Sequence, residues 1–312
     1  MRTLRALART AVAALLLPIL CAPHCFAWGH DAHSFINKLA GENLPDDVPA
    51  FLRSPEALAA LYYYGPQPDR WRSENNALYG SMVPEHDIDL EWADLAGPLP
   101  RTRYAYIAAL AAAQAKHPEL KLTPDKVGLL PYSTDEMYTM LMSAFRDYRS
   151  AVAKNQDTHP VEAEIVFLTG WLGHYVGDGS QPLHVTANYN GWTYGPNPNG
   201  YTTDNHIHSR FEGDFVHNNI KIEDVAPLVA ASKPKTLPRD IFDDYVTYLR
   251  HSHSLVEKVY QLDKTGAFTG AGTPEGKAFT EQCIAAGAIE LRDIIYTAWI
   301  HSADPIPVYH GN

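Results

Sequence analysis

Residues 167–184 read FLTGWLGHYVGDGSQPLH, an apolar stretch interrupted by His174, Asp178 and His184. His174 and Asp178 are four residues apart, so on a helix both side chains leave from one face. An imidazole and a carboxylate that point into an apolar core need a partner. The Gly-Ser-Gln-Pro sequence then ends the helix and brings His184 nearby. Taken alone, this pattern fits either a buried His–Asp hydrogen bond or a metal site.

A second pair with the same spacing follows a long loop. In HIHSRFE, residues 206–212, His208 and Glu212 are again four residues apart. Imidazole nitrogens and carboxylate oxygens are the usual protein ligands of zinc. The alternative is a helix-terminal histidine beside a solvated glutamate. Two such pairs about 30 residues apart favour the metal site.

The rest of the chain has helical periodicity and no convincing alternation of apolar and polar residues. We therefore predict an all-α fold, a single compact multi-helix domain. The expected helices cover residues 30–40, 102–117, 134–154 and 274–301. A Ser133-x-x-Glu136 capping box is expected to open the third of them, and Pro160 and Pro274 suit first helical turns. Segments 191–205 and 232–240, rich in Gly, Pro, Asn or Lys, are expected to be connections.

The N-terminus has the layout of a secretory signal, with Arg2, Arg5 and Arg9 before an apolar run and small residues up to Ala27. The apolar run is shorter than the roughly 20 residues that span a bilayer. We expect a signal peptide at 1–27 and one domain at 28–312, exported to the periplasm or the extracellular space. Cys283 is the one cysteine outside the signal, so the exported domain is expected to lack an intramolecular disulfide.

The exported domain is expected to be acidic. The whole chain has 25 basic and 36 acidic residues, and loss of the three signal arginines leaves a net charge of about −14. Such a chain has no general basic face for nucleic acid. Bound divalent metal would reverse the sign of the potential locally.

HYVGDGSQPLH followed by HSRFE resembles the zinc-dependent phospholipase C family, which is related in fold to the single-strand-specific zinc nucleases. Both groups begin with a mature N-terminal tryptophan, and WGHDAH supplies Trp28 and His33. GPQPDRW offers Asp69, and PEHDIDLEW offers His86. These matches follow the family's order from residue 28 to about 217.

The resemblance implies three zinc ions and a ligand for each position of the family's pattern. The first ion would be held by Asp69, His86, His174 and Asp178. The second would be held by the amino group and carbonyl of Trp28, by His33 and by a shared Asp178. The third would be held by His184, His208 and Glu212. The Trp28 amino group can bind metal only after proteolysis has freed it and it has lost its proton.

Three dications in one cleft imply hydrolysis of a phosphate ester. A water bridging two of them would lose its proton near neutral pH and attack phosphorus, while the third stabilises the phosphoryl oxygens and the departing alkoxide. Asp69 is predicted to be the catalytic residue that orients or deprotonates this water.

The substrate is predicted to be a phospholipid phosphodiester, with single-stranded nucleic acid or a nucleotide as the alternative. Glu212 and its HSRFE context resemble the phospholipases, whereas the short Trp28-to-His33 spacing resembles the nucleases. Asp87 stands where an aromatic residue is common in these relatives, and could favour a cationic head group or be a solvated turn residue. Asn188 and Tyr189 are further predicted substrate contacts. The loop aromatics Trp192, Tyr194 and Tyr201 could bind an apolar tail, a base or a membrane surface, or pack on their own domain.

Three functions therefore stand beside one another. The first is a phospholipase C-like hydrolase with transient membrane contact, and the second is a nuclease or 3′-nucleotidase using the same zinc cluster. The third is a secreted zinc-binding protein without catalytic activity. No obligate protein partner is expected for any of them.

Overall fold

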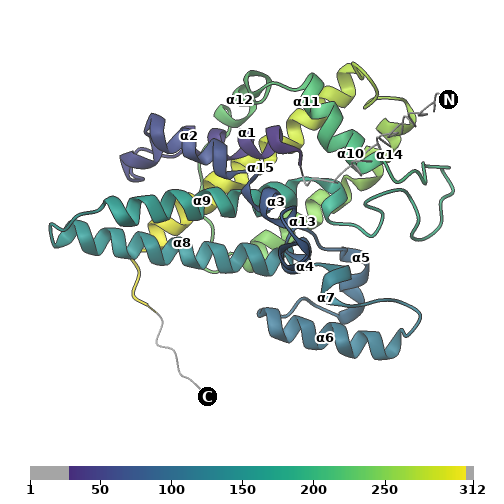
Figure 1. Cartoon of the computed structure of the whole chain (residues 1–312), viewed down its shortest axis with the longest axis horizontal. Coiled ribbons are helices and arrows are strands. Elements are labelled where there is room, and N and C mark those ends of the chain that lie inside the picture. Colours follow the sequence, from purple (N-terminus) through teal and green to yellow (C-terminus); the bar gives the residue numbers. More distant parts are fainter. Residues whose placement is uncertain (1–27, 307–312) are drawn as a thin grey trace, which may run out of the picture.

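The computed structural model describes residues 28–306, which form an all-α domain without a β-strand (Figure 1). The predicted signal peptide lies outside these residues. Five helices of ten or more residues form the centre of the domain: α1 (His30–Glu42), α2 (Pro55–Tyr64), α8 (Leu130–Ala153), α9 (His159–Ser180) and α15 (Pro274–His301). Every helix in the described part of the chain is too short or too polar to cross a bilayer.

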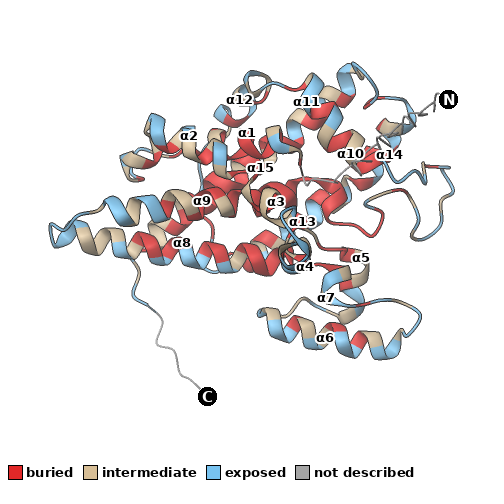
Figure 2. Ribbon diagram, in the orientation of Figure 1, coloured by how far each residue is buried: buried red, intermediate tan, exposed pale blue. Residues whose placement is uncertain are grey.

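Helix α9 is the element around which the others are arranged, since it packs against α8, α15, α2 and α1. Its C-terminal half is buried on all sides, as Figure 2 shows. Glycines make this packing close. A Cβ at Gly173 would lie 2.2 Å from Oδ1 of Asn37 on α1 and 2.6 Å from Cδ2 of Leu291 on α15. The absence of a side chain there lets three helices meet at one point.

Shorter helices complete the domain. Around the end of α9 lie α3 (Gln67–Arg72), α4 (Asn76–Met82), η2 (Val83–Glu85), η4 (Pro182–His184), α10 (Ile207–Ser209), the π-helix η5 (Arg210–Phe215) and α13 (Phe242–Ser254). The lobe beneath α4 in Figure 1 holds α5 (Leu90–Ala93), η3 (Asp94–Ala96), α6 (Arg103–Lys116) and α7 (Pro124–Val127). The remainder are η1 (Ala50–Arg53), α11 (Val216–Asn219), α12 (Ile222–Ala230) and α14 (Val256–Lys264).

The predicted all-α class is confirmed, and so are the helices at 30–40, 102–117 and 274–301 to within two residues at each end. Pro160 and Pro274 lie in first turns as expected, and segments 191–205 and 232–240 contain no helix. Cys283 is buried and free. Its neighbours on α15 form the apolar face that packs against α9.

The predicted capping box at Ser133 is wrong. Helix α8 begins at Leu130, with Pro131 in its first turn, so Ser133 lies inside the helix. Its hydroxyl donates to the Leu129 carbonyl and to Glu85. Glu136 pairs with Arg103 instead of the backbone. Because proline is tolerated in the first turn of a helix, α8 begins before the position that the Ser133 capping box indicated.

Candidate metal centre

The C-terminal half of α9 and the turn after it supply the centre of the site. His174 and Asp178 leave one face of α9, with His174 Nε2 3.4 Å from Asp178 Oδ2. The helix ends at Ser180, and Gln181 caps the following η4 by accepting a hydrogen bond from the Leu183 amide. This turn places His184 Nδ1 3.6 Å from Asp178 Oδ1. The predicted return of His184 to the pair is confirmed.

Three groups of potential metal ligands meet there, and all of their members are buried. Within each group, one ligand atom per residue lies within 4.8 Å of the others. The groups are His33, His174 and Asp178; Asp69, His86 and His174; and His184, His208 and Glu212. The structure therefore brings together eight of the nine predicted ligands, whose segments are scattered along the sequence.

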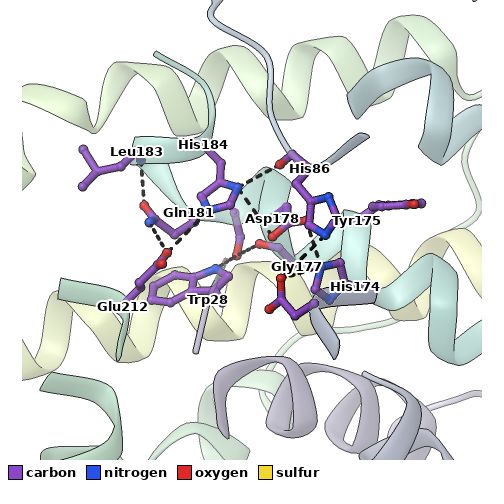
Figure 3. A network of polar contacts seen from close by, with 12 residues as sticks. Trp28, His86, His174, Tyr175, Gly177, Asp178, Gln181, Leu183, His184 and Glu212 are labelled. Carbon is purple, nitrogen blue, oxygen red and sulfur yellow. Dashed lines mark hydrogen bonds and ion pairs between the residues drawn. The ribbon is translucent and has the colours of Figure 1, made fainter. Parts of the chain in front are cut away.

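The first two groups share His174 and come from four elements. His33 on α1 stacks on His174 at 3.9 Å between ring centroids, and its Nε2 lies 3.5 Å from Asp178 Oδ1. Asp69 on α3 has Oδ1 3.6 Å from His86 Nε2 and 3.8 Å from His174 Nε2. Figure 3 shows Asp178 between His174 and His184.

The third group lies where α10 widens into the π-helix η5, a backbone form that is frequent at functional sites. Glu212 Oε2 is 2.8 Å from His208 Nε2 and 3.4 Å from His184 Nε2. The two Nε2 atoms are themselves only 3.1 Å apart. The Gln181 amide donates to the same Glu212 oxygen at 2.8 Å.

Backbone carbonyls orient four of the five histidines. Nδ1 lies close to a carbonyl oxygen in His86 (Met82, 2.6 Å), His174 (Gly65, 2.8 Å), His184 (His86, 2.8 Å) and His208 (Tyr189, 3.2 Å). A carbonyl only accepts, so each Nδ1 carries the proton and each Nε2 presents its lone pair to the site. This is the arrangement by which proteins orient metal-binding imidazoles.

The electrostatics of the groups favour a bound cation. Burial, reinforced by neighbouring histidines and Arg72, lowers the pKa of His33, His86 and His174 well below the ordinary value, so these rings are neutral. Burial, followed by the Asp69 charge, raises the pKa of Asp178 well above its usual range. For Glu212, burial is opposed and outweighed by His208 and His184, which bring its pKa to about 2.

Several of these atoms have no hydrogen-bond partner. They include Nε2 of His33, His86 and His174, both oxygens of Asp178 and Oε1 of Glu212. Buried polar atoms are rarely left in this state without a reason. A set of imidazoles and carboxylates converging at these distances could hold metal ions.

Arg72 is a site residue that the sequence reasoning missed. Its Nε forms an ion pair with Asp69 Oδ1 at 2.8 Å, three residues away on α3. Burial opposes its charge, but Asp69 and Asp178 offset this and raise the pKa of Arg72. The spacing of three residues from Asp69 was the available signal, because such residues share a helix face. Arg72 thus places a fixed positive charge beside the metal ligands.

Trp28 is fully buried beside the third group. Its indole donates to the Ser180 hydroxyl at 2.8 Å, and the Gly29 amide donates to the Glu212 carbonyl at 3.2 Å. Figure 3 shows the ring close to Glu212. Its predicted role as a ligand through a free amino group depends on cleavage after Ala27, which lies outside the described residues.

The predicted substrate contacts lie next to the ligands. Asp87, half-buried, follows His86, and burial raises its pKa to about 6 against the opposing effects of His184 and Arg72. Tyr189 is partly exposed, with its ring 6.3 Å from that of His208. The side-chain oxygen of Asn188 accepts hydrogen bonds from the backbone amides of residues 193 and 194 and so holds the loop.

Two of the three loop aromatics have a structural role. Trp192 and Tyr201 pack on each other at 5.0 Å and on Tyr260 of α14 at 5.1 and 5.8 Å. Of the roles left open for them, packing on their own domain is the one observed. Tyr194 instead meets Trp92 edge to face at 5.8 Å.

Comparisons with known proteins leave the family open. No protein-family model and no curated protein sequence matches the chain. Solved structures that resemble it include an alpha toxin from Clostridium absonum, with 13% identity, a TM-score of 0.41 and 88% of this chain covered. The alpha-toxin of Clostridium perfringens from an avian strain has 13% identity, a TM-score of 0.33 and the same coverage. The chain spans 66% and 64% of the length of these toxins, just under two thirds.

Proposed function

We propose that this protein is an exported zinc-dependent hydrolase of phosphate esters, with phospholipids as the favoured substrate. Three zinc ions are assigned to the three buried ligand groups, with Trp28 completing the His33 group once its amino group is free. The resemblance of the sequence to the zinc-dependent phospholipases C and their nuclease relatives also supports this proposal.

The observation that carries the proposal is the convergence of lone pairs at His184, His208 and Glu212. Nδ1 of each imidazole lies against a backbone carbonyl, so in the neutral form of both rings two Nε2 lone pairs face each other at 3.1 Å beside the Glu212 carboxylate. Two acceptors at this distance repel unless a cation or a proton lies between them. A zinc ion between the two nitrogens would remove this repulsion. The other two ligand groups offer zinc the same imidazole and carboxylate donors.

Zinc bound in such groups lowers the pKa of water and stabilises developing negative charge on phosphate oxygens. The side chains around it divide the remaining work. Asp69 accepts the proton of the attacking water or orients that water toward phosphorus. Arg72, held 2.8 Å from Asp69, is placed to neutralise a phosphoryl oxygen. Burial of the His, Asp and Glu ligands excludes bulk solvent and strengthens each electrostatic contact.

Phospholipid is favoured by charge. The chain has a formal net charge of −11, which repels a polyanion wherever metal does not screen it. A zwitterionic lipid carries no such net charge. The carboxyl of Asp87 beside the site could also meet a cationic head group.

A nuclease or 3′-nucleotidase is the second candidate. Tyr189 is partly exposed beside His208, and an exposed tyrosine next to a phosphate-binding centre can stack on a nucleobase.

Two measurements test the proposal. Elemental analysis of the exported protein, with its N-terminus sequenced, should give close to three zinc ions on a chain that begins at Trp28. Parallel assays on phosphatidylcholine and single-stranded DNA should give turnover of the lipid. Turnover of DNA alone would support the nuclease, and zinc without any turnover would support the non-catalytic reading.

The Asp69→Asn variant tests the assigned proton acceptor. It should lose most turnover and keep much of the zinc, because an amide oxygen can still bind metal but cannot take up the proton. Full activity would remove Asp69 from the mechanism.

A further inference from the structure

An open apolar cavity lies beside the segments that carry three of the metal ligands. It has a volume of about 570 Å³ and is lined by residues of α3, α4, η2, α6, α8 and α9. Its lining is mainly apolar and flexible, with Trp71, Leu78, Met82, Met137, Met140 and Trp171. This volume lies within the ~300–1,000 Å³ of small-molecule sites. Methionines are common where a pocket must fit a flexible apolar ligand.

The cavity and the metal centre are built from the same segments. Trp71 lies between the site residues Asp69 and Arg72 on α3. Tyr175 follows His174 on α9, and its ring lies 5.8 Å from that of His86. Each of the three ligands Asp69, His86 and His174 therefore has a close neighbour in the cavity wall.

Met82 connects the cavity to His86. It lines the cavity with its side chain and accepts the His86 Nδ1 proton with its carbonyl at 2.6 Å. A ligand that ends at the metals and continues past α3 would meet a cavity lined by neighbours of Asp69, His86 and His174.

The one arginine at the polar end of the cavity is already paired with two carboxylates. Arg103 donates to Glu85 at 2.6 and 2.9 Å and to Glu136 at 2.9 and 2.7 Å. Two carboxylates thus meet one guanidinium, which leaves no positive charge for an acidic ligand. Three of the helices that line the cavity, α4, α6 and α8, expose Tyr79, Tyr104 and Met140, side chains suited to a lipid surface.

We propose that this cavity is the alkyl-chain subsite of the enzyme and holds one acyl chain of the lipid whose phosphate lies at the metals. The inference rests on the proposed function and makes it more specific, because it assigns the apolar part of the substrate to named residues. The paired Arg103 excludes a free fatty acid from the same place.

Chain-length dependence tests the proposal with soluble, monomeric phosphatidylcholines. Each methylene buried is worth roughly a factor of four, so dihexanoyl lipid should exceed dibutyroyl lipid in kcat/KM by roughly tenfold or more. Ser81→Phe fills the cavity from its exposed rim and should reduce this gain to about twofold or less. Equal kcat/KM for both lipids in the wild type, or an unchanged gain in Ser81→Phe, would overturn the proposal.

Ser254→Phe is the matched control. Ser254 is an exposed serine near the end of α13, and its hydroxyl donates to the carbonyl three residues earlier, as that of Ser81 does. It does not line the cavity. The variant should keep the full chain-length gain.

A readout without catalysis separates this inference from the proposed function. An undecanol with a terminal bromine should quench tryptophan fluorescence saturably in the wild type, because Trp71 and Trp171 line the cavity. The quenching should be lost in Ser81→Phe and kept in Ser254→Phe. Absence of saturable quenching in the wild type overturns the alkyl site. Quenching without hydrolysis of any phospholipid overturns the proposed function and the link to substrate, while the alkyl site stands.

Discussion

The Nδ1 atom of His184 lies 2.8 Å from the backbone carbonyl oxygen of His86, so a ligand of one metal group is oriented by the main chain of another. The same two segments are joined a second time, because the Ile88 amide donates to the His184 carbonyl at 2.9 Å. The group of His184, His208 and Glu212 is thus mechanically connected to the group of Asp69, His86 and His174.

This connection predicts that His184→Ala affects two metals. The variant should lose one zinc outright, because a direct ligand is gone. It should also weaken zinc at the His86 group by about 10- to 100-fold, the usual effect of losing an outer partner. Competition with a chromogenic chelator measures both.

His159→Ala is the control for that measurement, because His159 is exposed and pairs only with Asp157 among the described contacts. It should retain all of the zinc with wild-type affinity. Loss of one zinc from His184→Ala with the others unchanged in affinity would show that the two groups are independent.

Arg72→Lys should lower kcat/KM by about 10- to 100-fold with zinc content unchanged. Lysine keeps the charge but lacks the planar fork that contacts Asp69 and that could contact a phosphoryl oxygen at the same time. Steady-state kinetics and metal analysis on the same preparation check this. Arg53→Lys, distant from the ligands in η1, should retain wild-type kinetics. An unaffected kcat/KM in Arg72→Lys would exclude the guanidinium from the reaction.

Zinc removal should destabilise the fold. At zinc about 1,000-fold above its dissociation constant, each site contributes roughly 4 kcal/mol to the free energy of unfolding. Without metal, the lone pairs of His184 and His208 and the buried Asp178 carboxyl are left uncompensated. Thermal unfolding followed by circular dichroism, before and after dialysis against a chelator, should show a large fall in Tm that added zinc reverses. An unchanged Tm would mean that metal is not part of the folded state.

Glu290 on α15 predicts a pH dependence of stability that is separate from the metal centre. Burial raises its pKa from 4.5 to about 7, opposed by Lys235. Between these values the folded chain keeps a proton that the unfolded chain releases, so the free energy of unfolding falls as pH rises. The fall attributable to Glu290 is roughly 3 kcal/mol between pH 4.5 and 7.

Glu290→Gln should abolish that part of the fall, and should therefore be more stable than the wild type at pH 8 but similar to it near pH 4.5. Urea unfolding at the two pH values measures the difference. A difference between variant and wild type that is the same at both pH values would contradict the assigned pKa.

The sequence predicted the convergence of the two His–carboxylate pairs because each pair is local. His174 with Asp178, and His208 with Glu212, stand four residues apart, and a helix fixes their geometry without knowledge of the rest of the fold. The long helix α15 was equally clear, because its apolar stripe and Pro274 agree. Such features need no tertiary information.

Other features depend on tertiary contacts that no local pattern encodes. The start of α8 depends on Pro131. The Ser133 hydroxyl donates a hydrogen bond to Glu85, which lies on another segment. The sequence left Trp192 and Tyr201 as possible ligand-binding residues, but in the fold both pack on Tyr260 of α14. The carbonyls that orient the histidines belong to distant residues such as Gly65, and backbone groups leave no trace in a sequence.

The distribution of the ligands along the chain has a consequence for the order of events during maturation. His33 and Glu212 are separated by more than half of the described residues, and α1, α3, η2, α9 and η5 must all be in place before the three groups exist. An incompletely folded chain offers only the two local pairs, which bind metal weakly. If the groups hold zinc as proposed, zinc loading would be a late step that acts on the finished fold, and the metal content of a preparation would measure the fraction of chains that have completed folding.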